Sequence, residues 1–410
     1  MTSINRTQSS NSRTIWLCLL VALLEGLDLQ APGVAGVRMA REFGFDHSQM
    51  GLAFSAGSLG LLPASAIGGR LSDLFGRKRV LMAAVALLGL FSLATTLTND
   101  LASLLVVRLL TGLGLGAAMP NLIALSTETS RPDRRNFAVG MMYSGMPIGA
   151  GLGSLVGVLW PETSAWRLVF LIGGFGPLLI LPLLALFLKD SFSAQDSTIL
   201  SGKASRPGVV FALFRDGRAA ATTSLWISYL GTVVILYVIL NWLPTMLQSR
   251  GLTGSQAHTV QVAYNFGGGA GALLITLLMD RIGRTATVMM MYGGMATALA
   301  LLGILAGNAM LVCAGFFAGM CLLGGQSALY AIASSIYPTE VRGTGVGSAV
   351  AVGRVGAIVS PLGAGLLMAA GLDATTLLFA CIPFVAVSAV AALLIVARFQ
   401  MKIGKAVVAQ

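Results

Sequence analysis

Long apolar segments alternate with short polar segments along almost the whole chain. Each apolar segment holds about 20 residues, the length that an α-helix needs to cross the hydrocarbon core of a bilayer, roughly 30 Å thick. The pattern therefore predicts an all-α membrane protein. Its twelve transmembrane helices are expected at residues 15–36, 50–69, 80–98, 101–126, 137–159, 166–188, 219–247, 259–279, 285–306, 310–337, 344–370 and 374–397.

The polar segments between these spans predict how the chain is organised. Residues 1–14 are rich in Ser, Thr and Asn and are expected to form a disordered N-terminal tail. The longest internal polar segment, 189–218, contains five basic residues, and we interpret it as a cytoplasmic linker. It separates residues 15–188 from residues 219–397, each expected to be a six-helix bundle. Residues 398–410 are expected to form a cytoplasmic C-terminal tail.

Composition and charge agree with this class and predict its orientation. The 410 residues are 56% hydrophobic and only 10% charged, and their mean hydropathy is +0.85, which excludes an ordinary soluble domain. Of the 26 lysines and arginines, twenty fall in the tails and the even-numbered loops. The odd-numbered loops hold only Arg38, Arg41, Arg167 and Arg250. Because cytoplasmic loops carry the excess of basic residues, both termini of this multi-pass protein are expected on the cytoplasmic side of the plasma (inner) membrane. Nucleic-acid binding is not needed to explain the net charge of +11.

The residue types that commonly bind metals or act in catalysis show no recognisable site pattern in this sequence. The four cysteines lie inside apolar segments at spacings without a metal-binding pattern, so we interpret them as small buried hydrophobic residues. The two histidines, His47 and His258, lie near the outer ends of predicted spans. An enzyme in the membrane would need a nucleophile with a base, or a set of metal ligands. We therefore expect neither enzymatic activity nor a cofactor.

The first predicted span carries two carboxylates, Glu25 and Asp28. Their spacing places both on one face of a helix, roughly 4.5 Å apart along the axis. Charges in a spanning helix almost always face a bundle interior or water, so the two acids predict a site for an ion or a substrate. A structural ion pair is the simpler alternative. A cleaved signal peptide, suggested by Arg6 and Arg13 before the apolar core, is disfavoured because the acids stand where small residues belong and many similar spans follow.

Three motifs of the first half of the chain recur in the second half. The recurring pairs are residues 73–79 with 280–284, Glu128 and Arg134 with Glu340 and Arg342, and Pro147 with Pro361. The displacement stays between 207 and 214 residues. A nearly constant displacement of half the chain predicts two pseudo-symmetric six-helix bundles, related by an axis along the membrane normal.

These motifs resemble those of the major facilitator superfamily, and the resemblance covers the whole chain. It rests on residues 73–79, on their copy at 280–284, and on Arg108 with a glycine ladder in the fourth span. The ladder glycines are Gly112, Gly114 and Gly116, which we also interpret as packing residues. Within that superfamily, residues 25–28 and 353–358 resemble segments of the aromatic acid:proton symporters. Two features resemble the 3-(3-hydroxyphenyl)propionate carriers in particular. They are the glutamate at position 25 and the segment 120–125.

The resemblance implies a major facilitator fold that works by alternating access. Spans one, four, seven and ten would line a central cavity, with spans five, eight and eleven beside it. The motif after the second span would be a cytoplasmic latch, and its arginines would bind acids such as Glu128. The simpler interpretation is that these basic residues only enforce topology. The expected latch residues are Asp73, Gly76, Arg77, Glu128, Arg134, Asp280, Arg284, Glu340 and Arg342.

Counting residues from the span ends places the membrane charges in two layers. Glu25 and Arg354 each lie about ten residues, or roughly 15 Å, from the cytoplasmic ends of their spans. Asp28 lies roughly 20 Å from that end, and Arg108, about seven residues from the outer end of its span, reaches nearly the same level. The count predicts an Asp28–Arg108 pair, which is either a coupling device or a static link between two spans.

The leading functional hypothesis is proton-coupled uptake of a small aromatic carboxylate, of phenylpropionate or hydroxybenzoate type. Arg354 is the first candidate to bind the carboxylate and Arg108 the second, because arginine offers a planar, always charged fork. Asp28 and Glu25 are the candidate proton carriers. Contacts to the ring and its hydroxyl are expected from Tyr229, Asn241, Gln326, Tyr330 and Asn121. The expected partners are a small aromatic acid, a proton and the lipid bilayer, and the chain is expected to be a monomer.

Proton-driven efflux of small aromatic or drug-like solutes is the alternative within transport. Residues 145–149 of the fifth span partly resemble the antiporter signature, which requires adjacent Gly and Pro. A membrane receptor without solute flux is a third alternative, and the lack of a soluble output domain counts against it.

Overall fold

The computed structural model describes residues 2–131, 135–160, 166–188, 213–215, 218–337 and 341–408, apart from some side chains inside these ranges. All regular structure in these ranges is helical. Twelve of the described helical stretches are long and apolar enough to cross a membrane. The predicted all-α membrane protein with twelve spans is therefore confirmed.

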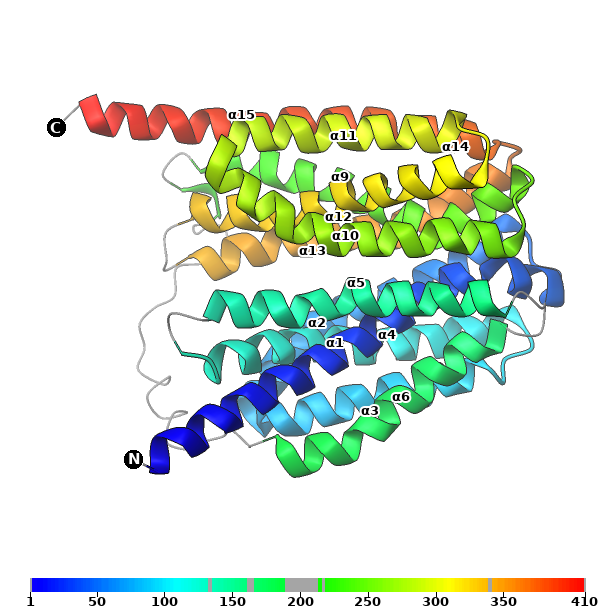
Figure 1. The fold of residues 1–410 in the computed structure, drawn as a ribbon, viewed down its shortest axis with the longest axis horizontal. Coiled ribbons are helices and arrows are strands. Elements are labelled where there is room, and N and C mark those ends of the chain that lie inside the picture. The colour runs from blue at the N-terminus through cyan, green and yellow to red at the C-terminus, as the bar shows by residue number, and fades with distance from the viewer. Residues whose placement is uncertain are drawn as a thin grey trace. The chain divides into compact units, whose positions relative to one another are not determined.

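The chain divides into two compact units, Met1–Lys203 and Ala204–Gln410. The described helices of unit 1 are α1 (Thr2–Phe43), α2 (His47–Phe75), α3 (Arg77–Thr95), α4 (Leu101–Glu128), α5 (Arg135–Leu159) and α6 (Trp166–Phe187). Within unit 1, α1 packs against α5 and α6, α2 packs against α4, and α3 packs against α4 and α6 (Figure 1).

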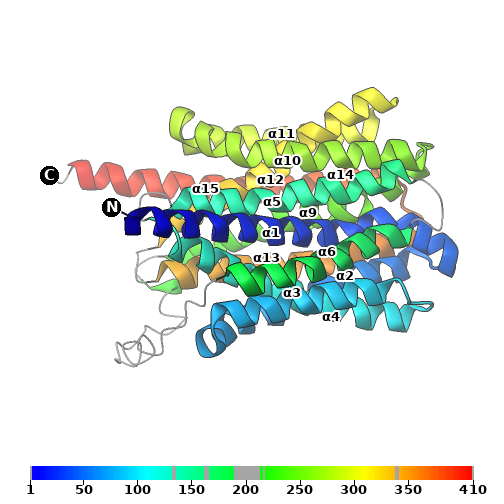
Figure 2. The same cartoon turned by 60° about the horizontal axis from the view of Figure 1, so that its bottom comes forward.

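The described helices of unit 2 pair in the same way. They are α9 (Ala219–Ser249), α10 (Gly254–Ile282), α11 (Arg284–Ile304), α12 (Asn308–Ile336), α13 (Arg342–Ala369), α14 (Ala374–Ala380) and α15 (Ile382–Val408). Within unit 2, α9 packs against α13 and α15, and α11 packs against α15. α12 packs against α10 and α11 (Figure 2). The internal repeat of the sequence is thus a repeat of helix pairing.

Glycines bring the paired helices of each unit into backbone contact. A Cβ added at Gly112 of α4 would lie 2.0 Å from the carbonyl oxygen of Gly57 in α2. Gly116 faces α2 in the same way, whereas Gly114 faces α3, because residues two apart on a helix point to different sides. In unit 2, a Cβ at Gly319 of α12 would lie 1.8 Å from the carbonyl oxygen of Tyr264 in α10. The packing interpretation of the glycine ladder is confirmed.

The two copies of the latch motif share one turn. Gly76 separates α2 from α3 with φ 91° and ψ 142°, and Gly283 separates α10 from α11 with φ 82° and ψ 162°. These backbone angles are essentially restricted to glycine. The turn explains why both copies of the motif contain glycine at this position.

Several helices begin or end a few residues away from the predicted bounds, and two differences have a clear physical reason. α1 begins at Thr2, so the predicted disorder is wrong for residues 2–14; extending an existing helix costs far less than nucleating one, and this segment contains neither Gly nor Pro. The last predicted span is interrupted at Cys381, between α14 and α15. Pro383 explains the break, because it lacks an N–H donor and its ring clashes with the carbonyl of Phe379, four residues earlier.

Candidate functional site

A buried ion pair joins α1 to α4 inside unit 1. Nη1 of Arg108 lies 3.3 Å from Oδ2 of Asp28, and the two side chains are 4% and 0% exposed. The hydroxyl of Ser92 on α3 donates to Oδ1 of Asp28 at 2.8 Å. Both carboxylate oxygens are therefore bound, and the pairing that the depth count predicts is confirmed.

α6 also contributes to this site, in addition to α1, α3 and α4. The guanidinium of Arg108 lies over the ring of Phe170, with Cζ 5.4 Å from the ring centroid, a distance suited to a cation–π contact. Ser92 also lies 3.3 Å from the carbonyl oxygen of Phe170. A Cβ added at Gly173 would lie 3.2 Å from Oγ of Ser92, so glycine leaves room for this hydroxyl. The spans that correspond to α3 and α6 were not expected to contribute to the site, yet they supply the contacts that surround the acid.

The Nε–H of Arg108 is a buried hydrogen-bond donor that has no acceptor among the described residues. An unsatisfied buried donor costs roughly 1–3 kcal/mol, so an additional acceptor at this guanidinium would be stabilising. Glu25, the other intramembrane acid, is also buried on α1, with 1% of its surface exposed.

A second polar cluster lies inside unit 2, where α13 faces α9. Nη1 of the half-buried Arg354 donates to the hydroxyl of Tyr237 at 3.4 Å. Asn241, one turn further along α9, donates to the carbonyl oxygen of Tyr237 at 2.9 Å. The rings of Tyr229 and Tyr330 meet edge to face, with centroids 5.5 Å apart. A cation, a hydroxyl, an amide and two aromatic rings thus come from α9, α12 and α13 of one unit.

The remaining residues predicted to contact the substrate are Gln326 and Asn121. Gln326 is half-buried on α12, one turn before Tyr330. Asn121 is buried on α4 and donates to the carbonyl oxygen of Ala117 at 2.8 Å. It is thirteen residues from Arg108, hence roughly 20 Å along the helix, and belongs to unit 1 rather than to the cluster around Arg354.

Sequence reasoning missed Ser92, Phe170 and Tyr237. Tyr237 had a usable signal, because it lies eight residues after Tyr229 and four before Asn241 and therefore shares their face of the helix. Ser92 and Phe170 had none, since a neutral residue in an apolar span is usually a packing residue.

The latch motif forms an ion pair at one end of unit 1. Nη2 of Arg77, the first residue of α3, lies 2.7 Å from Oε1 of Glu128, the last residue of α4. This contact, predicted from the motif, is confirmed, although Glu128 ends a helix instead of standing in a loop. Arg284 begins α11, as Arg77 begins α3. Arg134 and Glu340 lie outside the described residues, as do the side chains of Asp73, Asp280 and Arg342.

Arg38 and Arg167, which the sequence pattern assigns to outer loops, lie within helices. Arg38 is buried within α1. Its Nη2 donates at 3.0 Å to the carbonyl oxygen of Gly157, two residues before the end of α5. The end of α5 provides both an acceptor and a favourable dipole, which explains why this charge is not in a loop. Arg167, the second residue of α6, lies 2.7 Å from Glu42 of α1. Trp166 donates to the same carboxylate.

The sequence matches the family model of the Major Facilitator Superfamily over residues 18–255 and 225–407. It is 44% identical to the 3-(3-hydroxy-phenyl)propionate transporter of Escherichia coli, over 96% of this chain and 97% of that protein. It is 32% identical to the gallate transporter of Pseudomonas putida, over 96% and 93% of the two chains. The 4-hydroxybenzoate transporter of Pseudomonas aeruginosa is also 32% identical, over 87% and 86%.

Two solved structures share the fold at low sequence identity. A D-xylose–proton symporter gives a TM-score of 0.76 at 17% identity, over 93% of this chain and 96% of that chain. A bacterial homolog of the human lysosomal transporter Spinster gives 0.77 at 17% identity, over 96% and 98%.

Proposed function

Since the chain belongs to the major facilitator superfamily, we propose that it imports a small aromatic carboxylate together with a proton, by alternating access. The curated relatives reported above are named transporters. The chain is accordingly a multi-pass membrane transporter and not an enzyme. We place it in the plasma (inner) membrane, and the distribution of its basic residues favours cytoplasmic termini.

The observation that carries the substrate assignment is the cluster around Arg354. An aromatic carboxylate needs a cation for its charge and aromatic surface for its ring. Unit 2 offers Arg354 on α13 and the edge-to-face pair of Tyr229 and Tyr330, and a Cβ added at Gly353, the residue before Arg354, would lie 3.4 Å from Cδ1 of Tyr229. The Tyr237 hydroxyl orients the guanidinium, so the fork is held for a bidentate carboxylate. The names of the relatives support the same class: a phenylpropionate, gallate and a hydroxybenzoate.

We assign the proton to Asp28, with Glu25 as the second candidate. A proton on Asp28 would cancel the charge that faces Arg108, and Ser92 then has an alternative acceptor in the carbonyl oxygen of Phe170. A buried arginine that loses its counter-ion is strongly destabilised, which favours arrival of another carboxylate. Linkage then requires that the proton and the substrate each raise the affinity for the other.

The Arg77–Glu128 ion pair supports a latch at the end of unit 1 where α3 begins. Its side chains are 25% and 40% exposed. Exposed pairs contribute less than about 1 kcal/mol, which suits a contact that forms and breaks in each transport cycle. The roles of the other latch residues stay a prediction.

Efflux gains no support from the partial antiporter signature in α5. A Cβ at Gly145 would lie 2.6 Å from the carbonyl oxygen of Leu19, and one at Gly149 would lie 1.7 Å from that of Leu23. Close packing of α5 on α1 accounts for both glycines.

Uptake by protein reconstituted in liposomes tests the proposal. With the outside more acidic than the inside, we expect labelled 3-(3-hydroxyphenyl)propionate to accumulate above its outside concentration, and its amide analogue not to accumulate. Protein-free liposomes correct for passive entry of the neutral acid. Accumulation of the amide, or outward pumping of either compound, would contradict the proposal.

A further inference from the structure

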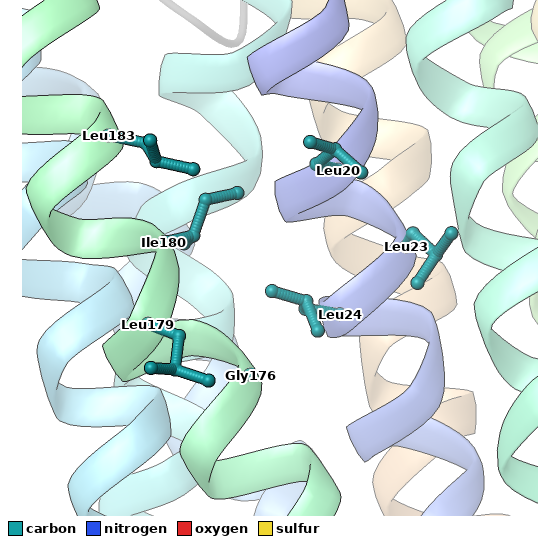
Figure 3. A pocket seen from close by; sticks show the side chains of 7 residues that line it. All are labelled: Leu20, Leu23, Leu24, Gly176, Leu179, Ile180 and Leu183. Atoms are coloured by element: carbon teal, nitrogen blue, oxygen red, sulfur yellow. The ribbon is translucent and has the colours of Figure 1, made fainter.

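A shallow groove runs between α1 and α6 within the membrane-spanning part of unit 1 (Figure 3). Leucines 20, 23 and 24 of α1 form one wall, and Gly176, Leu179 and Leu183 belong to the other. Gly176 packs against Leu24 of α1, because a Cβ there would lie 2.6 Å from Cδ2 of Leu24. Towards Leu20 and Leu183, which are 41% and 42% exposed, the groove is open.

The chemistry of the lining selects a hydrocarbon occupant. All side chains that line the groove are aliphatic, and its volume is roughly 280 Å³. Water there would find no hydrogen-bond partner on these side chains. A helix about 10 Å in diameter is too wide for a space of this volume, whereas a single acyl chain is narrow enough. A lipid tail therefore fits better than a helix from another protein.

Basic and aromatic residues follow the groove at the end where α1 begins and α6 ends. Arg13 and Trp16 precede Leu20 by seven and four residues, so they share its face of α1. Both are exposed. At the same end of unit 1, the ammonium of Lys78 on α3 donates to the carbonyl oxygen of Ala185 in α6 at 2.7 Å. Ala185 is two residues beyond Leu183 and therefore lies on another side of α6 than the groove.

We propose that this groove is a binding site for one anionic phospholipid. One acyl chain lies between α1 and α6, Trp16 lies at the level of the head group, and Arg13 binds the phosphate. Tryptophan is enriched at the membrane interface, and basic residues there bind anionic lipids. The lipid would hold together the ends of α1 and α6. The proposal does not depend on which solute the protein transports.

Native mass spectrometry of the full-length protein in detergent, titrated with phosphatidylglycerol or phosphatidylethanolamine, tests the site. We expect one phosphatidylglycerol to bind at a concentration about fivefold lower than phosphatidylethanolamine, as for one basic residue at an anionic head group. Arg13→Gln should weaken this binding about fivefold. Arg41→Gln, which removes an exposed arginine from the other end of α1, is the matched control and should not change it.

Filling the groove gives an independent test. Leu20→Trp should abolish the high-affinity phosphatidylglycerol adduct, while Leu394→Trp, at a 51% exposed leucine of α15, should leave it intact. Thermal unfolding of each variant in detergent shows whether it is folded, and Arg13→Gln decides the matter if Leu20→Trp is not. Equal binding of the two lipids, or equal effects of the groove and control variants, would overturn the proposal. So would a protein dimer that Leu20→Trp disrupts.

Discussion

A carboxylate buried in a spanning helix needs a counter-charge and hydrogen-bond donors, and Asp28 has both. Arg108 supplies the charge and Ser92 a hydroxyl. Arg354 is in a different situation, because it is only half-buried and its fork is oriented by a neutral hydroxyl, that of Tyr237. In the proposed function, Arg354 is the first candidate to bind the substrate carboxylate, and Arg108 is the second, once its counter-ion Asp28 has taken up a proton.

Arg354→Lys should weaken binding of the aromatic acid by about tenfold or more although the charge is kept. An ammonium is a point charge that cannot bind both carboxylate oxygens in the plane of a guanidinium. Calorimetric titration of the purified protein with 3-(3-hydroxyphenyl)propionate measures the effect. Arg41→Lys, at an exposed position of α1, serves as the control; unchanged affinity in Arg354→Lys would remove the bidentate contact from the account.

At the scale of elements, helix contacts in each unit depend on glycines, and three helix N-termini depend on aspartate caps. Gly149 allows α5 to touch the backbone of α1. Asp46, Asp100 and Asp373 cap α2, α4 and α14, each accepting backbone N–H bonds of the first turn. The effect of these features on stability can be measured by unfolding, separately from transport.

Gly149→Ala should destabilise the protein by about 1–3 kcal/mol, because the methyl group would meet the carbonyl of Leu23 and force α1 and α5 apart. Gly140→Ala is the matched control on the same helix, since a Cβ there has no neighbour within 4 Å. It should be neutral or slightly stabilising, as alanine favours helix over glycine. Thermal unfolding in detergent distinguishes the two; equal melting temperatures would show that α1 and α5 are not in contact at Gly149.

The capping aspartates predict a loss of stability in acid. Hydrogen bonds from the Thr376 hydroxyl, the Ser48 hydroxyl and the Ser103 backbone N–H hold the pKa values of Asp373, Asp46 and Asp100 below the usual aspartate value. A lowered folded-state pKa stabilises the protein above the unfolded-state pKa, and this stabilisation is lost as the pH falls through the folded-state pKa. The caps should therefore act fully from neutral pH down to about 5 and fail below about 4.

The triple variant Asp46→Asn, Asp100→Asn, Asp373→Asn tests this expectation, because asparagine also caps helices but does not titrate. Its melting temperature should fall less steeply in acid than that of the unmodified protein. Identical acid dependence of the two proteins would show that other groups control acid unfolding.

At the scale of the whole molecule, hydropathy predicted all twelve spans, since the bilayer sets one length for every helix. The depth count found the Asp28–Arg108 pair because the helix rise is constant and the charges in spans are few. Depth gives no direction around the helix axis, so Ser92 and Phe170 could not be deduced. Arg38 is assigned to a loop by the sequence pattern because it is charged and near the end of a span. It lies within α1 instead, where the carbonyl oxygen of Gly157 near the end of α5 accepts its hydrogen bond.

The central claim is that the substrate and a proton cross the membrane together. It is tested most directly by proton movement driven by the substrate, in liposomes with a pH-sensitive dye inside and equal pH on both sides. Adding 3-(3-hydroxyphenyl)propionate outside should acidify the interior beyond the level in protein-free liposomes, and Asp28→Asn should abolish this excess while still allowing exchange of labelled substrate. Entry of substrate without excess acidification in the unmodified protein would contradict the account.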